Sequence, residues 1–305
     1  MPKKKNTERK PPKVSPKPST EDQEAVNLKV EKSTSFPVIG LGASAGGLEA
    51  LKLFFSAVPE NSPMAYIVVV HMAPTQPSMM PELLQRTTPL PVSSAKDGQT
   101  IEPGHIYIIP PNKEITLYNG EIQLLDMLKK RVSHPIDIFL RSLAQDQGKQ
   151  AAAVILSGTG TDGSLGIKEI NANEGVVLVQ SEESSGYDGM PRSAISTGLA
   201  DVIVPPDEMP KKLLEYFSHT KKLPARKSST TTTTTTTTTT EKQQKWLNKI
   251  FAILRSQIGH DFSSYKVNTI LRRITRRMGL NQIDSHEVYV RFLRENPSEV
   301  GGVVS

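Results

Sequence analysis

The chain has 305 residues, with 37 lysines and arginines against 31 aspartates and glutamates, and it has no cysteine. The lack of cysteine excludes disulfides and thiolate metal sites, and the histidines show no ligand spacing, so we expect neither a metal nor a cofactor. The sequence shows no apolar run of about 18 residues and no signal peptide, so we expect a cytoplasmic protein without a membrane-inserted segment.

Part of the net charge of +6 lies in residues 1–35, which hold the basic run Lys3–Lys5, several prolines and few large apolar residues. Such a composition cannot bury enough apolar surface to fold, so we expect a disordered basic arm. Basic charge alone is compatible with nucleic-acid binding. The arm lacks the interleaved aromatic residues and the motifs of nucleic-acid readers, however, and we expect no nucleic-acid partner.

Apolar β-type runs alternate with helical patterns from Phe36 to about Ser218. The helical patterns cover Leu48–Val58, Ile136–Gln145 and Ile167–Asn173. This alternation is typical of an α/β domain with a doubly wound, mainly parallel sheet. The stretch Ile101–Leu125 contains a YNGE turn and predicts a small antiparallel excursion instead.

The run VIGLGASAGG places Ser44 in a glycine-rich turn, between the β-type run Phe36–Leu41 and a helical pattern that begins at Leu48. A serine on such a turn exposes its hydroxyl at the carboxyl edge of a sheet. The N–H groups of the following helix start lie nearby and can stabilise an oxyanion. The position is that of a nucleophile, although serine is also common in such turns as a turn or capping residue.

The same turn fits the dinucleotide fingerprint G-x-G-x-x-A through Gly40, Gly42 and Ala45. A dinucleotide site requires an acidic residue at the end of the second strand. Here the second β-type run, Tyr66–His71, ends in a histidine, and no carboxylate follows before Glu82. A histidine suits a general base, so this stretch favours a hydrolase over a nucleotide-binding protein. An ordinary surface or core histidine is the simpler alternative.

A third strand-and-turn unit, Ala151–Gly163, places Asp162 in a glycine-rich turn. Since the carboxyl ends of parallel strands share one edge, we expect Ser44, His71 and Asp162 to meet there as a catalytic triad. The histidine would act as the base, and the carboxylate would fix its tautomer. Asp162 is equally typical of a residue that opens a turn or caps a helix. His134 is the reserve candidate for the base.

Six motifs, in this order, resemble the catalytic domain of chemoreceptor protein-glutamate methylesterases, the CheB family: GASAGG, HM, PGHIYIIPP, SHPID, LSGTGTDG and GMPRSAI. The resemblance implies that Ser44 is the nucleophile, His71 the base and Asp162 the orienting residue. It implies methylated helices of cytoplasmic chemoreceptor regions as partners, and deamidation of particular glutamines as a second activity. The family commonly has threonine where this chain has Ala45, and methionine where it has Thr159.

The resemblance further implies that Met190, Pro191 and Arg192 form a substrate-side loop. Arg192 would hold the acidic surface of a receptor helix through charge-assisted contacts, and a solvated surface arginine is the alternative. Many members of the family carry a phosphorylatable receiver domain where this chain has its basic arm. We therefore expect no phosphorylation control in cis.

After Phe217 the composition changes to lysine, serine and a threonine tract that ends at Thr240, which predicts a linker over residues 219–240. Residues 241–305 show helical periodicity, with an arginine-rich helix over Thr269–Leu280 and a third helix near Ser285. We therefore expect a basic arm, an α/β domain over residues 36–218, a linker and a small all-α domain.

The segment GHDFSSYKVNTILRRITRRM resembles the N-terminal helical domain of chemoreceptor methyltransferases, the CheR family. The resemblance implies substrate contacts for Arg273, Arg276 and Arg277, and a basic, solvated helix face is the alternative. The domain that binds S-adenosylmethionine in that family would follow Ser305. We therefore expect this truncated hybrid to have no methyltransferase activity and to use S-adenosylmethionine only within a longer fusion. The whole sequence favours a serine esterase over a noncatalytic scaffold that retains the fold and binds receptor or kinase partners.

Overall fold

The structure is a computed structural model that describes residues 34–71, 79–127, 134–222, 237–258 and 267–304. The expected basic arm lies outside the described residues except for its last two positions. Helix α6 (Met209–Lys222) reaches into the expected linker, and helix α7 (Thr237–Ile258) begins inside it, while residues 223–236 lie outside the described residues. The domain boundaries proposed from the sequence stay predictions.

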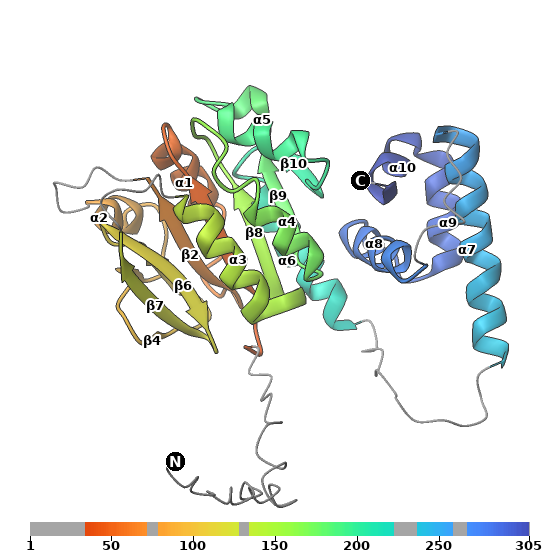
Figure 1. Ribbon diagram of the computed structural model, residues 1–305, viewed down its shortest axis with the longest axis horizontal. Coiled ribbons are helices and arrows are strands. Elements are labelled where there is room, and N and C mark those ends of the chain that lie inside the picture. The colour runs from red at the N-terminus through yellow and green to blue at the C-terminus, as the bar shows by residue number, and fades with distance from the viewer. Residues whose placement is uncertain (1–33, 72–78, 128–133, 223–236, 259–266, 305) are drawn as a thin grey trace, which may run out of the picture. The chain divides into compact units, whose positions relative to one another are not determined.

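A parallel sheet forms the centre of the α/β region (Figure 1). Among the described residues it has seven strands in the order β10-β9-β8-β1-β2-β5-β3, and every neighbouring pair is parallel. The strands are β1 (Val38–Ala43), β2 (Ala65–Val70), β3 (Val92–Ser94), β5 (Ile106–Ile108), β8 (Ala151–Ile155), β9 (Val176–Gln180) and β10 (Val202–Val204). The sheet confirms the expected α/β class.

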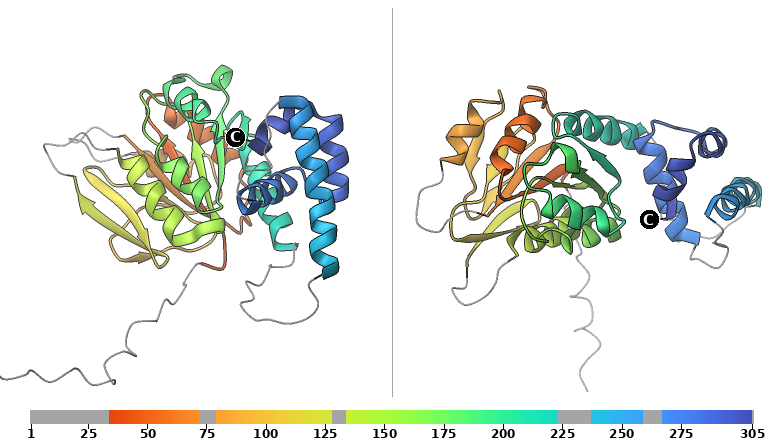
Figure 2. Two further views of the ribbon diagram at one scale, coloured as in Figure 1. Left: turned by 45° about the vertical axis from the view of Figure 1, so that its right-hand side comes forward. Right: turned by 90° about the horizontal axis from the view of Figure 1, so that it is seen from above.

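Helices cover both faces of this sheet (Figures 1 and 2). Helices α3 (Pro135–Gln147) and α4 (Gly166–Ala172) pack side by side on one face, and α1 (Gly47–Ser56) and α6 lie on the other. Strands β1, β2 and β8 are buried along their whole length, which explains why they are continuous apolar runs in the sequence. Shorter elements are α2 (Met80–Gln85), α5 (Gly189–Ser196) and the 3-10 turns Gly148–Gln150 and Glu182–Ser184.

Two glycines of β1 allow α3 to lie directly on the strand. A Cβ added to Gly40 would lie 2.8 Å from both Leu143 Cδ2 and Phe139 Cε1, and one added to Gly42 would lie 2.5 Å from Ile136 Cγ2. Helix packing therefore explains the G-x-G part of the dinucleotide fingerprint. The close approach that glycine permits here is to a helix, not to a pyrophosphate.

The stretch expected to be an antiparallel excursion is only partly one. Strands β6 (Lys113–Tyr118) and β7 (Glu121–Asp126) form the expected hairpin, and β4 (Gln99–Thr100) joins β7 in a separate small sheet. Strand β5, in contrast, pairs in parallel with β2 and β3 in the main sheet, so the prediction was wrong there. All three residues of β5 are buried, and its pairing with distant strands, which the local turn residues do not reveal, gives it that place.

The helices α7, α8 (Val267–Leu280), α9 (His286–Glu295) and α10 (Pro297–Val304) pack around an apolar core of their own. This core includes Trp246, Leu247, Ile250, Leu254, Ile270, Ile274, Tyr289, Leu293 and Val303. The expected all-α region after the sheet is thereby confirmed, with α10 as an element that the sequence analysis missed. Within the described parts of the chain, no helix combines the length and the apolar character needed to cross a membrane.

Candidate active site

The three residues of the expected triad leave the sheet at the same edge. Ser44 directly follows β1, His71 directly follows β2, and Asp162 lies in the loop after β8. Strand β1 lies between β2 and β8, so the strand order reverses at this point of the sheet. In open α/β sheets such a reversal creates the crevice beyond the carboxyl ends of the strands, where side chains from distant segments meet.

The three side chains are connected in a row. Ser44 Oγ lies 3.5 Å from His71 Nδ1, and His71 Nε2 lies 2.9 Å from Asp162 Oδ2. A neutral imidazole that carries its proton on Nε2 donates to the carboxylate and leaves Nδ1 free to accept the serine proton. The Ser44 contact is long for a hydrogen bond, as is common before substrate binds. The arrangement can activate the hydroxyl as a nucleophile.

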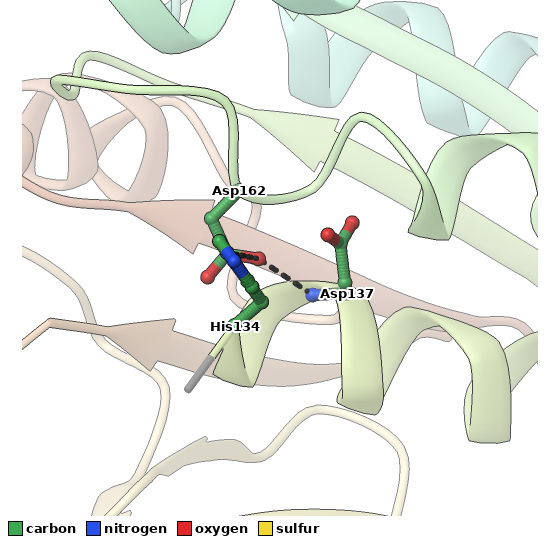
Figure 3. Close-up of side chains that lie close together, drawn as sticks. All are labelled: His134, Asp137 and Asp162. Carbon is green, nitrogen blue, oxygen red and sulfur yellow. Dashed lines mark hydrogen bonds and ion pairs between the residues drawn. The ribbon is translucent and has the colours of Figure 1, made fainter. Parts of the chain in front are cut away.

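The Asp162 carboxylate is buried and surrounded by N–H donors. Its Oδ2 accepts from His71 and, at 3.0 Å, from the backbone N–H of Ile136. Its Oδ1 accepts from the backbone N–H of Asp137 at 2.9 Å (Figure 3). The same oxygen accepts from the backbone N–H of Gly163, also at 2.9 Å. Two of these N–H groups belong to the first turn of α3, where a helix lacks internal acceptors and favours negative charge. The helix start therefore holds the charge that orients His71.

His134, the reserve candidate for the base, lies next to Asp162. Its Nδ1 is 4.0 Å from Asp162 Oδ1, and its side chain is half exposed. The hydrogen bond to Ser44 is made by His71 instead. The geometry therefore favours His71 as the base.

Three groups of the kind that bind metals lie within 4.8 Å of one another: His134, Asp137 and Asp162 (Figure 3). The four lone-pair directions of the Asp162 carboxylate already receive four N–H groups. Asp137 Oδ1 accepts from the N–H groups of Leu165 and Gly166, at 2.9 and 2.7 Å. A metal ion would have to displace these bonds, so we interpret the cluster as the hydrogen-bonded centre of the loop.

The electrostatic environment of this cluster shifts the pKa of the Asp137 carboxyl group. Burial raises the pKa of its carboxyl group, and the nearby charge of Asp162 adds to the increase. The backbone N–H groups of Gly166 and Leu165 oppose it, because they stabilise the ionised form. Two carboxyl groups therefore share a small buried region in which backbone N–H groups supply the compensating positive charge.

A buried serine that the sequence analysis missed, Ser157, holds the nucleophile turn. Its carbonyl accepts the Ser44 N–H at 3.0 Å, and its hydroxyl donates to the Ala45 carbonyl at 2.9 Å. The same hydroxyl accepts the Tyr187 N–H at 2.9 Å. Gly46 completes the turn with φ of 71°, and a Cβ there would lie 2.8 Å from Ser157 Oγ. Ser157 belongs to the LSGTGTDG motif, but nothing in the motif distinguishes it from an ordinary turn serine.

The expected substrate-side loop is a helix. Met190, Pro191 and Arg192 lie in α5, and Met190 and Pro191 are buried. Proline is tolerated in the first turn of a helix, since its missing N–H would have had no acceptor there. Arg192 is exposed but forms ion pairs with Glu182 and Asp188. The predicted loop conformation was wrong, because these residues are helical. A receptor contact by Arg192 stays a prediction.

Arg276, one of three arginines expected to contact substrate, lies at the opposite edge of the sheet. It is only 8% exposed, and its guanidinium group donates to Asp201 Oδ2 at 3.2 Å and to the Gly175 carbonyl at 3.0 Å. Gly175 and Asp201 directly precede β9 and β10, so they mark the amino ends of parallel strands. Ser44 follows the carboxyl end of β1. The triad and Arg276 therefore occupy opposite edges.

The other two arginines are on the same helix, α8. Arg277 donates to Glu299 Oε1 and to the Asp201 carbonyl, both at 2.7 Å. Arg273 is half-buried and lines a small cavity together with Asp201 and Arg277. The alternative of a solvated basic face is wrong for the buried Arg276. Substrate contacts by these arginines stay a prediction, and their position gives them no part in chemistry at the triad.

Comparison with known proteins agrees with this architecture. Residues 39–213 match the family described as CheB methylesterase, and residues 245–304 match the all-alpha domain of CheR methyltransferase. A protein-glutamate methylesterase/protein-glutamine glutaminase of Pectobacterium atrosepticum is 34% identical over 190 residues, which are 61% of this chain and 54% of that protein. An uncharacterised 104.1 kDa protein of Rhodobacter capsulatus is 30% identical over 236 residues, 73% of this chain and 25% of that protein.

Among solved structures, the CheB methylesterase catalytic domain of Thermotoga maritima matches with a TM-score of 0.56 and 32% identity. The match covers 60% of this chain and 99% of that domain. The chain spans a quarter of the Rhodobacter protein and 54% of the Pectobacterium protein. The first family match includes more than half of the 305 residues. The chain therefore belongs to the CheB methylesterase family.

Proposed function

We propose that the chain is a serine esterase that removes methyl groups from glutamyl methyl esters on the cytoplasmic helices of chemoreceptors. The observation that carries the proposal is the row of contacts from Ser44 Oγ through His71 to Asp162. Family membership and the name of the Pectobacterium relative support the substrate class. We place the reaction in the cytoplasm, as part of chemotaxis signalling.

In the first half of the reaction, Ser44 Oγ attacks the ester carbonyl carbon while His71 Nδ1 accepts the hydroxyl proton. The resulting oxyanion is stabilised by backbone N–H groups at the start of α1, because Ala45 offers no hydroxyl there. The carbon–oxygen bond to the methoxy group then breaks. The leaving oxygen takes the proton from His71 and departs as methanol, and a glutamyl ester of Ser44 remains.

In the second half, a water molecule gives a proton to His71 and attacks this ester. The glutamate carboxyl group leaves, and the proton returns to Ser44 Oγ. Asp162 keeps the imidazole in one tautomer and stabilises its positive charge in both halves. The same sequence with ammonia as the leaving group would deamidate a glutamine, and we include that reaction in the proposal.

A noncatalytic scaffold is the alternative that the sequence left open. It would be favoured by a Ser44 hydroxyl beyond hydrogen-bond reach of His71, and the separation of 3.5 Å is within reach. Methyl transfer is not part of the proposal, since the helices that match the CheR all-alpha domain contribute no strand to a nucleotide-binding sheet in the described residues.

The test combines methanol release from methylated receptor with labelling by a fluorophosphonate, which reports an activated serine without knowledge of the receptor. We expect Ser44→Ala to abolish both signals. Ser56→Ala is the matched control, because Ser56 is an exposed serine at the end of α1 that bonds only the Leu53 carbonyl in the described structure. Unchanged turnover in Ser44→Ala would refute the proposal.

The base is tested in the same assays with two histidine variants. We expect His71→Ala to abolish methanol release and fluorophosphonate labelling, and His134→Ala to keep both within about threefold, since of these two histidines only His71 contacts Ser44 Oγ in the described structure. The reverse result would assign the base to His134. In the wild type, kcat/KM should fall toward acidic pH, because a protonated imidazole cannot accept the serine proton.

A further inference from the structure

Asp137 uses its backbone and its side chain to hold both ends of the stretch 162–166. Its N–H donates to Asp162 Oδ1 at 2.9 Å, at the start of this stretch. Its own Oδ1 accepts from the N–H groups of Leu165 and Gly166, at 2.9 and 2.7 Å, at the end of the stretch. Asp137 is 6% exposed, so these bonds are made away from water.

Besides Asp137, the stretch is held by the Asp162 carboxylate, which accepts the Ile136 N–H at 3.0 Å, and by the close packing of Gly163 on Ile155 and of Gly166 on Leu140. The side chain of Leu165 is 53% exposed and contributes little apolar packing. Helix α4 begins at Gly166, where N–H groups lack intrahelical acceptors. The Asp137 carboxylate supplies an acceptor for two of them, which a neutral apolar side chain cannot do.

We propose that Asp137 is a positioning residue, which holds the loop so that the Asp162 carboxylate stays against His71. The inference rests on the proposed esterase function, because it assigns a role within that reaction. Asp137 touches neither Ser44 nor His71 in the described contacts, and it acts through Asp162. Figure 3 shows the Asp162 carboxylate next to the backbone nitrogen of Asp137.

Three variants separate this role from loss of stability and from loss of charge. Asp137→Ala removes the acceptor, and Asp137→Asn removes the charge but keeps an oxygen that can accept from Leu165 and Gly166. Asp146→Ala is the matched control on the same helix, because the Asp146 carboxylate also accepts two backbone N–H groups, from Asn119 and Gly120. These belong to the β6–β7 turn, which carries no triad residue.

Two readouts are measured on each variant after thermal melting has shown that it is folded. The first is kcat and KM for methanol release. The second is the titration of the His71 ring by NMR, which does not depend on turnover. The titratable groups that the structure places around Asp162 include His71, His134 and Asp137, so the three signals are followed together.

We expect Asp137→Ala to lower kcat by about 10²-fold, the effect of a displacement near 1 Å in an active site, with little change in KM. The NMR signals of the His71 ring should shift in the direction that Asp162→Asn produces, because the ring loses part of its carboxylate contact. Asp137→Asn should restore most of both values. Asp146→Ala should leave both values as in the wild type.

Each contrary result has its own meaning. If Asp137→Asn is as impaired as Asp137→Ala, the reaction needs the charge of Asp137 and not its acceptor oxygen, and the positioning role is refuted. If Asp146→Ala loses kcat equally, the effect is one of general stability and the proposal is also refuted. Unchanged kcat and His71 titration in Asp137→Ala would overturn it directly. A wild type without methanol release would refute the proposed function, and the His71 titration would still test the hold of Asp137 on the loop.

Discussion

The two edges of the central sheet each carry a buried aspartate. At the carboxyl edge, Asp162 accepts backbone N–H groups and contacts His71. At the amino edge, Asp201 accepts the Val177 N–H at 2.9 Å and contacts Arg276. Both carboxylates accept backbone N–H groups, three at Asp162 and one at Asp201. They differ in the side chain that faces them.

This difference determines what each edge can do. An imidazole gains and loses a proton near neutral pH, so the pair at the carboxyl edge changes its charge during a reaction. A guanidinium group stays charged at any pH that the protein meets, so the pair at the amino edge is a fixed contact. Asparagine keeps the shape of aspartate and removes its charge. Replacing each aspartate by asparagine therefore tests activity at the carboxyl edge and stability at the amino edge.

The largest expected effect is on activity at the carboxyl edge. Asp162→Asn should lower kcat by about 10⁴-fold, the loss seen when a triad histidine is left in the wrong tautomer. Asp201→Asn should keep kcat within about threefold, since the triad lies at the other edge. Methanol release from methylated receptor measures both. A comparable loss of kcat in the two variants would mean that the edges are not independent.

The second effect is on stability at the amino edge. Asp201→Asn should lower the free energy of unfolding by about 3 kcal/mol, because it leaves the buried Arg276 guanidinium without a counter-charge. Both side chains of the pair are under 10% exposed, so solvent screens the interaction little. Urea unfolding measures the change. A loss below about 1 kcal/mol, typical of a surface pair, would contradict the burial of this contact.

A smaller effect tests the shape of the arginine. Arg276→Lys keeps the positive charge but cannot reach both the Asp201 carboxylate and the Gly175 carbonyl with a planar fork, so we expect a loss of about 1 kcal/mol. The control is Arg272→Lys on the same helix, because Arg272 is 60% exposed and pairs with the exposed Glu174. Its loss should stay at about 0.3 kcal/mol. Equal losses in urea unfolding would mean that charge alone holds the contact.

The smallest effect concerns pH. Burial raises the pKa of Asp137 in the folded protein, so its contribution to stability is complete below the unfolded pKa and is lost as pH rises through the folded pKa. Asparagine does not ionise, so the Asp137→Asn variant does not lose stability in this way as pH rises. From about pH 4 to pH 7, the unfolding free energy of the wild type should therefore decline relative to that of Asp137→Asn. Parallel urea-unfolding profiles would contradict the raised pKa.

The residues of the candidate triad could be predicted because each one follows a continuous apolar run. Such runs indicate strands buried on both faces, and parallel strands place their carboxyl ends at one edge. Ser44, His71 and Asp162 therefore come together by a rule that needs no knowledge of the distances between them. The class of the fold follows from the same runs and from the helical patterns between them.

The supporting contacts could not be predicted, because their partners are backbone groups or side chains far away in the sequence. Ser157 and Asp137 look like an ordinary turn serine and an ordinary first-turn acid, and only the fold brings their acceptors and donors near. The burial of Arg276 depends on Asp201, 75 residues earlier. Strand β5 was misplaced for the same reason, since its parallel neighbours β2 and β3 are not adjacent to it along the chain.

The central place of β1 also has a consequence for how the protein is made. One neighbour, β2, is synthesised soon after β1, but the other, β8, begins at Ala151, 108 positions after Ala43. At the usual speed of about 5–20 residues per second, the ribosome needs roughly 5 to 20 s to deliver it. During that interval the nascent chain exposes the unpaired edge of an apolar strand, which is a template for aggregation. We therefore expect chaperones to bind ribosome-attached chains that end between β2 and β8, and to release them once β8 has emerged.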